Sequence, residues 1–181
     1  MLMLSDTELV RRFQNGDSTA FAEFSERHRG GLYRMAYAWT GDAMLAEDAV
    51  QEAFYRSYTG LLKFRFRSEP KTWLVRVCRN ISRELVRKHG REVHVEQSQL
   101  PESGNEAEVP RLSDRHPSAV TIVSHLPPMQ REVLVLRLFE EYPIKDVARI
   151  LRIREGTVKA HYAKATANLK RLAEEYGVTN D

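Results

Sequence analysis

The sequence predicts an all-α protein in which two small helical domains are joined by a flexible linker. Apolar residues recur at steps of three and four along most of residues 1–90 and 118–181, which places them on one face of successive α-helices. Residues 91–117 lose this periodicity and are interrupted by three prolines and a glycine. At 181 residues, the chain is long enough for one large domain or two small ones.

Charge is distributed unevenly along the chain. Net charge is +4 over residues 1–90, −3 over 91–117 and +2 over 118–181, which together give +3. Two basic blocks therefore flank an acidic strip. The acidic strip either serves solubility or imitates nucleic-acid charge in a basic channel of a partner, and composition does not separate these alternatives.

Cysteine and hydropathy indicate the compartment. Cys78 is the single cysteine, so we expect neither a disulfide framework nor a paired-cysteine metal site. The first residues lack a long apolar core, and no other apolar run approaches the length of a membrane span. We therefore expect a soluble protein of the reducing cytoplasm with no cofactor, no metal and no membrane contact of its own.

The first two helices carry clear start signals. Ser5 and Glu8 have the spacing of a capping box, and Asn15-Gly16 is expected to end the first helix. Asp17 can cap the second helix, which Gly30-Gly31 can interrupt. The expected apolar faces are Leu9, Val10 and Phe13 in the first helix, and Phe21, Phe24, His28, Leu32, Met35 and Trp39 in the second. We interpret His28 as a packed histidine, because no second ligand-type residue lies beside it at ligand spacing.

The third helix is expected to follow a turn and cap at Thr40-Gly41-Asp42. Its narrow apolar stripe comprises Ala46, Ala49, Val50, Ala53 and Phe54, and the opposite face carries Glu47, Asp48, Gln51, Glu52 and Tyr55. Such a face is ordinarily solvated. The alternative is a docking face for a positively charged partner, which the residues alone support only weakly.

Residues 63–88 hold nine basic residues against two acidic ones, an imbalance that indicates a phosphate-bearing partner. Pro70 suits the first turn of a helix. In that helix, Trp73, Val77, Ile81 and Leu85 form an apolar stripe, and Arg76, Asn80, Arg83 and Arg87 follow an offset track. One face is therefore expected to pack, while the neighbouring face can meet nucleic acid.

Aromatic and basic residues alternate just before this helix, as Phe64, Arg65, Phe66 and Arg67. Exposed aromatics among arginines suit unstacked bases, each stack being worth roughly 1–3 kcal/mol. The alternative is that both phenylalanines belong to the core and the arginines to a solvated face.

The second domain is expected to begin with a short helix from Ser118. Leu126-Pro127-Pro128 then starts a helix ending near Glu140, with core residues Val133, Leu134, Leu136, Leu138 and Phe139. A short helix, a tight turn ending at Ile153 and a longer helix from about Glu155 give a helix-turn-helix layout. Thr157, Lys159, Ala160, His161 and Lys164 project from the half of the last helix that would enter a major groove, although they also fit an ordinary surface.

Three motifs together resemble bacterial RNA polymerase sigma factors of the extracytoplasmic-function group, the small kind that has only sigma regions 2 and 4. They are AEDAVQEAF (46–54), RSEPKTWLVRVCRNISRELVRK (67–88) and LPPMQREVLVLRLFEEYPIKDVARILRIREGTVKAHYAKATANLKRL (126–172). The resemblance implies a region 2 helical bundle at 1–90, a linker at 91–117 and a region 4 helix-turn-helix domain at 118–181.

The resemblance also implies partners and site residues. Core RNA polymerase, through the clamp helices of its largest subunit, would bind Asp48, Gln51, Glu52, Phe54 and Tyr55. The minus-ten promoter element would contact Phe64, Arg65, Phe66, Arg67, Lys71, Trp73, Arg76, Asn80 and Arg83. The minus-thirty-five element would contact Arg154, Thr157, Lys159, Ala160, His161, Ala163 and Lys164. The family further implies a linker that lies in the RNA exit region and control by an anti-sigma factor.

Three residues depart from the family pattern. Arg154 stands where a capping residue usually precedes the recognition helix, Arg152 where glycine usually makes the turn, and Pro143 where a cap usually starts the motif. A missing cap costs about 1 kcal/mol, and a non-glycine left-handed residue costs about as much. We expect the fold to survive these changes.

Two other functional classes remain as hypotheses. GTVKAH at 156–161 is also similar to the recognition helix of dimeric response regulators, which would make the chain a free-standing transcriptional regulator. Glu47, Asp48 and Glu52 would serve a metal-dependent nuclease, but no histidine or lysine lies at suitable spacing for general-base chemistry. We therefore expect no catalytic residues and no enzyme activity.

Overall fold

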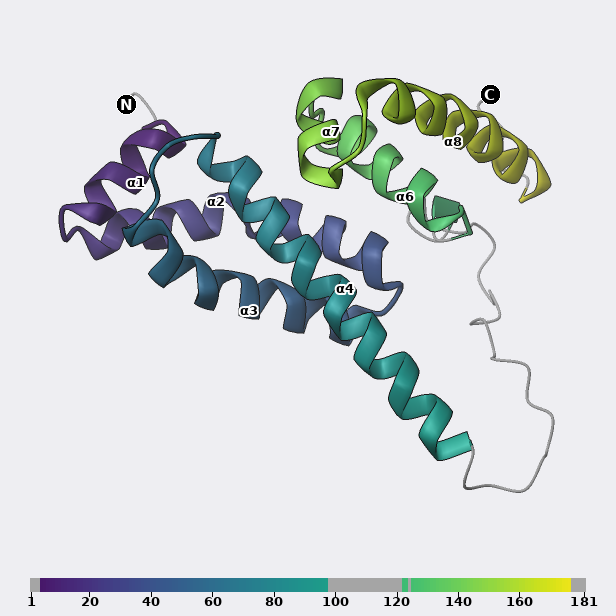
Figure 1. Ribbon diagram of the computed structural model, residues 1–181, viewed down its shortest axis with the longest axis horizontal. Coiled ribbons are helices and arrows are strands. Elements are labelled where there is room, and N and C mark those ends of the chain that lie inside the picture. Colours follow the sequence, from purple (N-terminus) through teal and green to yellow (C-terminus); the bar gives the residue numbers. More distant parts are fainter. Residues whose placement is uncertain (1–3, 98–121, 124, 177–181) are drawn as a thin grey trace.

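The computed structural model describes residues 4–97, 122–123 and 125–176, and within them every regular element is helical (Figure 1). The predicted all-α class is confirmed. An N-terminal helical unit consists of α1 (Asp6–Gln14), α2 (Ser18–Thr40), α3 (Ala43–Leu62) and α4 (Pro70–Gln97). A C-terminal helical unit consists of α6 (Pro128–Leu134), the π-helical turn η1 (Val135–Phe139), α7 (Ile144–Leu151) and α8 (Glu155–Glu175).

The predicted start and stop signals of the first helices are present. Ser5 and Glu8 form both hydrogen bonds of the capping box, and Asp17 accepts hydrogen bonds from the first backbone amides of α2. Gly41 lies in the left-handed region with φ 72°, and Asp42 caps α3 by accepting from the Leu45 amide at 2.8 Å. These local signals fix where α2 and α3 begin, and so which face each helix buries.

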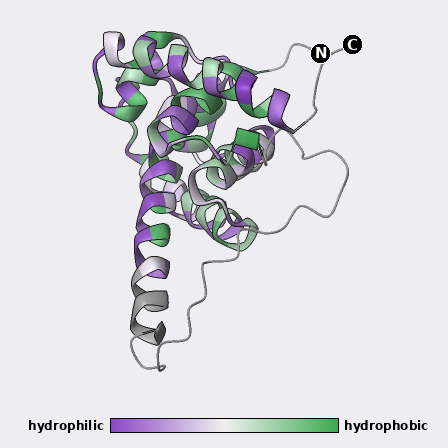
Figure 2. Cartoon of the chain, turned by 90° about the vertical axis from the view of Figure 1, so that its right-hand side faces the viewer, coloured by the Kyte–Doolittle hydropathy of each residue, from purple (hydrophilic) through white to green (hydrophobic). Residues whose placement is uncertain are grey.

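Helix α2 lies at the centre of the N-terminal helical unit and packs against α1, α3 and α4. The predicted stripe of α3 is entirely buried, as are Leu9, Val10 and Phe13 of α1. Phe24, Leu32 and Met35 of α2 are buried, whereas Phe21, His28 and Trp39 are only partly buried. Gly30-Gly31 does not interrupt α2. Figure 2 shows hydrophobic residues on helix faces turned toward neighbouring helices.

The buried face of α4 differs from the predicted stripe by about one residue. Leu74, Val75, Cys78 and Ile81 are buried, whereas Trp73, Val77 and Leu85 lie half-buried at its border. Burial raises the pKa of the Cys78 thiol to about 12. The stripe was misplaced because α4 packs against both α2 and α3, which demands a wider apolar face than one row of side chains.

Helix α4 continues to Gln97, so residues 91–97 of the predicted linker are helical (Figure 1). The apolar pattern ends earlier, but no glycine or proline follows Gly90 until Pro101, and a backbone helix can continue without a packing face. The rest of the predicted linker, 98–117, lies outside the described residues. The short helix expected from Ser118 also lies outside them, apart from the helical residues 122–123.

The C-terminal helical unit contains a π-helical turn that the sequence pattern does not predict. The Glu140 amide donates to the Val135 carbonyl at 3.2 Å, five residues back. Val133, Leu134 and Leu136 are buried as predicted, but Leu138 is 49% exposed, so its predicted place in the core is wrong. The wider turn rotates Leu138 away from the core. The side chain of Phe139 is outside the described residues.

The three residues that depart from the family pattern, Pro143, Arg152 and Arg154, all lie at helix ends of the helix-turn-helix. Arg152 adopts the left-handed conformation (φ 58°, ψ 45°), and the Ile153 amide donates to the Ala148 carbonyl at 3.1 Å. Neither Pro143 nor Arg154 makes a side-chain cap hydrogen bond. The motif therefore tolerates an arginine at the turn and two uncapped helix starts.

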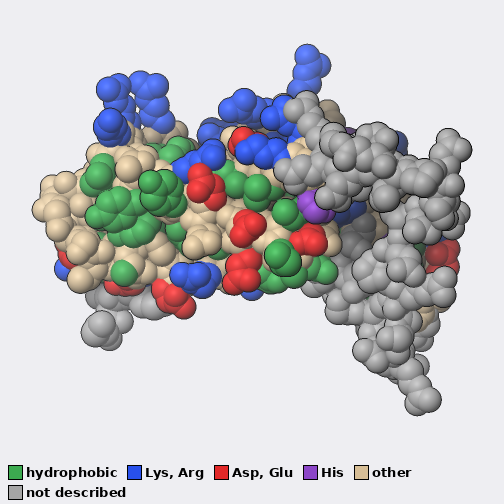
Figure 3. Space-filling model, turned by 90° about the horizontal axis from the view of Figure 1, so that it is seen from below, with side chains coloured by type: hydrophobic (Ala, Val, Ile, Leu, Met, Phe, Trp, Pro, Cys, Tyr) green, Lys and Arg blue, Asp and Glu red, His purple; other side chains and the backbone are tan. Residues whose placement is uncertain are grey.

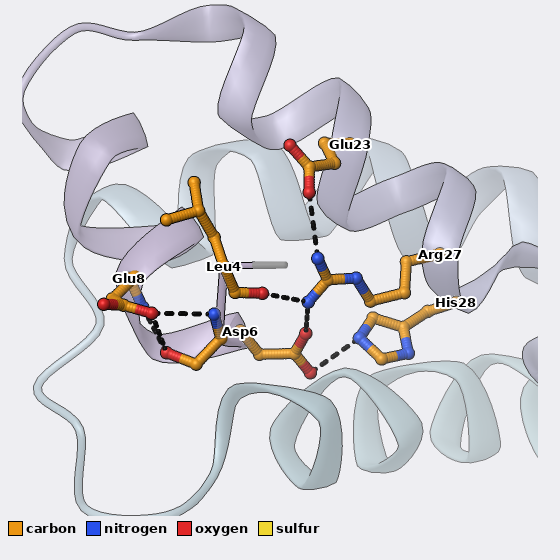
Figure 4. A network of polar contacts seen from close by, with 7 residues as sticks. Leu4, Asp6, Glu8, Glu23, Arg27 and His28 are labelled. Atoms are coloured by element: carbon orange, nitrogen blue, oxygen red, sulfur yellow. Dashed lines mark hydrogen bonds and ion pairs between the residues drawn. The ribbon is translucent and has the colours of Figure 1, made fainter. Parts of the chain in front are cut away.

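A polar network joins α1 to α2 (Figure 4). Asp6 accepts from Arg27 at 2.9 Å and pairs with the His28 Nε2 at 2.7 Å. Arg27 also donates to the Leu4 carbonyl and to Glu23. Burial alone raises the pKa of Asp6, but the hydrogen bonds and charges of His28 and Arg27 outweigh burial and lower the pKa below its ordinary 3.8. His28 is thus a paired histidine at the core boundary.

We expect Asp6→Asn to lower the free energy of unfolding near neutral pH, by up to about 1 kcal/mol because the pairs are partly exposed. The ionised carboxylate stabilises the fold above the unfolded pKa of 3.8, and this stabilisation is lost as pH falls through the lower folded value. The urea midpoints of wild type and Asp6→Asn should therefore converge at acidic pH. Glu26→Gln, which removes an exposed carboxylate from α2, is the control. A gap that stays constant at every pH would contradict the prediction.

Candidate functional site

One face of α3 presents carboxylates, an amide and an aromatic ring. Glu47, Asp48 and Gln51 are exposed, and Tyr55 is 77% exposed. Glu52 is half-buried and accepts from Arg56 at 2.6 Å. Seen from below, the surface carries acidic side chains among hydrophobic ones (Figure 3). This combination suits a protein partner, because aromatic residues at the centre of an interface and charges at its rim are typical.

Two grooves flank this face. A groove of about 550 Å³ lies between α3 and α4 and is lined by Gln51, Tyr55 and Leu85, among others. A second groove, of about 940 Å³, lies between α2 and α3, with Tyr33 and Met44 on its walls. Phe54 lines the second groove but is only 9% exposed and lies beneath the Arg29 guanidinium. Of the five residues expected to bind polymerase, Phe54 is therefore mainly a core residue.

Residues 63–69, here called the basic loop, separate their aromatic side chains from their charged ones. Arg65 and Arg67 are exposed, whereas Phe64 and Phe66 are half-buried. Phe64 packs against Phe66 with ring centroids 5.2 Å apart, and against Trp73 at 5.6 Å. The two phenylalanines therefore contact the core and remain partly accessible.

The basic loop is held by close contacts from both sides. The indole of Trp73 lies against the backbone of Gly60, where a Cβ atom would come within 2.5 Å of the ring. From α1, the Gln14 amide donates to the carbonyls of Leu61 and Phe64 at 2.8 and 2.9 Å. Arg11 lies 5.3 Å from the Phe66 ring centroid.

A cleft of about 450 Å³ lies beside the basic loop. Its lining includes the ring of Trp73 and five cationic residues, and no carboxylate lines it. The cationic residues are Lys63, Arg65, Arg67, Arg76 and Arg149. Arg149 pairs with Asp146 at 3.5 Å outside the cleft. Aromatic surface beside an excess of positive charge is suited to a nucleobase and its phosphates.

The remaining residues expected at the minus-ten element lie along α4. Asn80 and Arg83 are exposed. Arg76 is half-buried in the cleft. Lys71 instead lies 3.5 Å from the Glu140 carboxylate of the C-terminal helical unit and 4.9 Å from the Tyr142 ring centroid. The structure therefore brings most of the predicted residues to one surface, with Lys71 engaged by the second unit.

Helix α8, the second helix of the helix-turn-helix, presents a continuous accessible face. Its buried side comprises Val158, Ala165 and Leu172, which pack toward the rest of the unit. His161 is half-buried. The other residues expected at the minus-thirty-five element are exposed, namely Arg154, Thr157, Lys159, Ala160, Ala163 and Lys164. This mixture of donors and small apolar groups is what a major groove accepts.

Four residues with contacts at the site or between the two helical units were not identified from the sequence. Arg79 and Glu132 form a buried ion pair of 2.6 Å between the two helical units, and they are 4% and 8% exposed. Gln14 reaches the basic loop from α1, and Arg149 reaches the cleft from α7. Each depends on contacts between distant parts of the chain, which periodicity cannot report. The one local signal was for the ion pair: an arginine at position 79, within the apolar face of its helix, indicates that a buried partner charge is needed.

Among the described residues, no helix is long and apolar enough to cross a membrane. Nor, in that part of the chain, do three or more His, Cys, Asp or Glu side chains gather as metal ligands would.

Sequence comparisons match both helical units to one family. The family described as Sigma-70 region 2 matches residues 24–92, and Sigma-70, region 4 matches residues 118–169. The chain is 32% identical over 174 residues to the ECF RNA polymerase sigma factor SigM of Mycobacterium tuberculosis, covering 93% of this chain and 84% of that protein. It is 25% identical to SigW of Bacillus subtilis, with coverage of 90% and 93%.

Solved structures show the same fold. CnrH, solved in complex with the cytosolic domain of CnrY, superposes with a TM-score of 0.70 at 22% identity, covering 94% of this chain and 97% of that one. The sigma factor RpoE of Bartonella quintana, solved with the anti-sigma factor NepR, gives a TM-score of 0.67 at 25% identity, covering 84% and 97%. With two matched regions and a relative above 30% identity across nearly its full length, the chain belongs to the ECF group of RNA polymerase sigma factors.

Proposed function

We propose that this sigma factor divides its work among three surfaces: α3 binds core RNA polymerase, the basic loop with α4 recognises and melts the minus-ten element, and α8 recognises the minus-thirty-five element. The observation that carries the proposal is the cationic, aromatic cleft beside the basic loop. It acts in the cytoplasm as an initiation factor that performs no catalysis of its own. The corresponding domains are residues 1–90 and 118–181, joined by the linker 91–117, whose first residues, 91–97, continue α4.

The chemistry of promoter melting matches the basic loop. An unpaired base must leave its stack at a cost of about a few kcal/mol. Stacking on an aromatic side chain and phosphate contacts from arginines offset that cost. Arg65 and Arg67 are exposed for phosphate binding, and Trp73 with Phe64 gives the cleft an aromatic wall.

The recognition helix supplies direct contacts to base edges. Lys164 and Lys159 are exposed donors that can reach guanine or phosphate. Ala160 and Ala163 are exposed methyl groups that can pack against thymine. Because these side chains project from one half of α8, substituting one of them should alter a single promoter element.

We extend the regulation of a relative to this chain. RpoE of Bartonella quintana was solved in complex with an anti-sigma factor, and this chain shares its fold at 25% identity. An anti-sigma factor that covers the grooves beside α3 would exclude polymerase from the same residues. Tyr33, Met44 and Tyr55 are the exposed apolar groups there.

We expect Tyr55→Ala to weaken binding to core RNA polymerase by about tenfold, because an exposed aromatic side chain that becomes buried in an interface commonly contributes 1–2 kcal/mol. Thermal stability should not change, since Tyr55 is 77% exposed in the free protein. Fluorescence anisotropy with core polymerase measures the affinity. Tyr176→Ala, a tyrosine in the C-terminal helical unit, serves as the control. Equal affinities of Tyr55→Ala and wild type would remove α3 from the polymerase interface.

We expect substitutions in the two DNA-binding surfaces to have separable effects. Promoters are first selected from a randomised library with core polymerase, and Lys164→Ala and Arg65→Ala are then assayed on mutants of each element. Lys164→Ala should lose discrimination at the minus-thirty-five element, and Arg65→Ala should slow opening at the minus-ten element, each by about 1–3 kcal/mol. Lys170→Ala, exposed further along α8, should behave as wild type. If both variants affected the two elements equally, this division would be wrong.

A further inference from the structure

We propose that Gln14 is a positioning residue for promoter melting, which it serves by holding the basic loop in its binding conformation from α1. The proposal rests on the assignment of the basic loop to the minus-ten element. Gln14 is half-buried, and its amide nitrogen lies 2.8 Å from the Leu61 carbonyl and 2.9 Å from the Phe64 carbonyl. One side chain thus bonds both the end of α3 and the start of the basic loop.

The two carbonyl groups lie where the backbone lacks its usual partners. The last carbonyls of a helix have no amide four residues ahead, and here α3 ends at Leu62. The Phe64 amide turns back to the Leu61 carbonyl at 3.1 Å, so Gln14 provides a second donor to that group. At the Phe64 carbonyl, Gln14 holds the residue whose ring begins the aromatic cluster with Trp73.

The basic loop also adopts a conformation that needs support. Phe66 has φ 53°, in the left-handed region that residues other than glycine seldom adopt. Arg11 lies over the Phe66 ring, and Gln14 follows Arg11 by three residues, so both project from one face of α1. Because Phe64 and Phe66 are held inward, Arg65 and Arg67 are directed outward, where DNA can reach them.

Helix α1 is itself fixed, which makes it able to position the loop. Phe13 is buried against the rings of Phe21 and Tyr58, with centroids 5.1 and 5.0 Å away. At the other end, Asp6 pairs with Arg27 and His28 of α2 (Figure 4). Gln14 therefore joins the basic loop to the body of the N-terminal helical unit.

Three substitutions separate hydrogen-bond donation from side-chain bulk. Gln14→Glu keeps the shape but replaces the donor with a carboxylate that faces two carbonyl oxygens. Gln14→Ala removes both, and Gln14→Lys restores a donor. We expect open-complex formation on a selected promoter to slow by on the order of tenfold in Gln14→Glu and Gln14→Ala. In Gln14→Lys it should slow by much less. Affinity for core polymerase and discrimination at the minus-thirty-five element should not change.

The controls distinguish this proposal from the assignment of the basic loop. Asn168→Ala removes a similar half-buried amide hydrogen bond, to Gln130, in the C-terminal helical unit and should leave promoter opening unchanged. If Arg65→Ala and Arg67→Ala slow opening but the Gln14 series does not, the proposal for Gln14 is overturned alone. If none of these variants affects opening, the assignment of the basic loop fails with it. Equal activity of Gln14→Glu and wild type would exclude a role as donor.

A separate set of contacts carries a second inference: the geometry points to a self-closed form in which the C-terminal helical unit occupies part of the DNA-binding surface. Glu140 is central to it, with a side chain that is only 6% exposed. Its carboxylate lies 3.0 Å from Arg34 and 3.5 Å from Lys71. A carboxylate thus occupies the position that a phosphate oxygen would take beside Lys71.

Other contacts hold the two helical units together at the same interface. The Arg79 guanidinium donates to Glu132 at 2.6 Å in a buried pair, and Arg131 donates to the Ala38 carbonyl at 3.2 Å. The Cα of Gly31 lies so close to Glu140 that an added Cβ would stand 2.9 Å from the carboxylate oxygen. DNA that binds Lys71 must therefore displace Glu140, and opening would expose this surface. Opening would also withdraw Arg149 of α7 from the cleft, so the DNA contacts of the open form at this cleft would come from the N-terminal helical unit.

Adjacent glycines of α2 provide a matched test of closure. In Gly31→Ala the new methyl group would stand 2.9 Å from the Glu140 carboxylate, so this side chain must shift from its place beside Arg34 and Lys71, whereas in Gly30→Ala the new methyl meets only Arg34 at 3.6 Å. Both substitutions favour the helix itself, so loss of folding is not expected. Glu132→Gln removes the charge that pairs with Arg79 and should raise the ratio of open to closed molecules by on the order of a hundredfold.

Energy transfer between dyes at Ser18→Cys and Lys170→Cys reports closure, because both sites are exposed and the native Cys78 is buried. Binding to an oligothymidine of about 20 nucleotides reports access to the DNA-binding surface. We expect Gly31→Ala and Glu132→Gln to lower energy transfer and to bind oligothymidine several-fold more tightly, and Gly30→Ala to match wild type. Unchanged energy transfer in both variants would overturn the closed form. Opening without tighter binding would overturn the competition with DNA.

Discussion

A buried charge pair, Arg79 with Glu132, joins two helical units that each have their own apolar core. A charge that is removed from water without its partner costs several kcal/mol, so neither residue can stay buried alone. In the closed form the ions are paired, and in the open form that we propose both ions would be hydrated. A partly separated Arg79–Glu132 pair would leave each charge without its partner and without full hydration, which is unfavourable. We therefore expect the two units to be either fully in contact or fully apart.

The surfaces that we assign to polymerase and promoter differ in chemistry because they lie on different elements. Helix α3 buries a stripe made mainly of alanines, which lets α2 and α4 approach closely and leaves its acidic face outward. The basic loop connects the end of α3 to the start of α4 and is not itself helical, so its arginines are not bound to a helix face and project into solvent. Helix α8 buries one narrow side and leaves its opposite face free for a groove. A short chain can thus carry three interfaces.

Local sequence signals predicted the features that depend on neighbouring residues. The capping box at Ser5 and the caps at Asp17 and Asp42 are all set by residues within four positions. The left-handed turn at Arg152 was expected only from the resemblance to the family. Features set by distant contacts were not predictable in this way. Arg79 is 53 residues from Glu132, and Gln14 is 50 from Phe64. Both pairings depend on how helices pack, and a polar residue in a periodic pattern does not disclose its partner.

The π-helical turn at Val135–Phe139 affects how the contact between the two helical units, made by Glu140 with Arg34 and Lys71, can change over evolution. A π turn holds one more residue than the α turn it replaces, and the extra residue is accommodated without loss of the helix. Deleting one residue here would restore an ordinary α-helical ladder with the residues on either side nearly in register, because the π turn had only absorbed the extra residue, so Glu140 would stay on the side of Arg34 and Lys71. A single codon can therefore be gained or lost at this turn while the Glu140 contacts between the two units are kept.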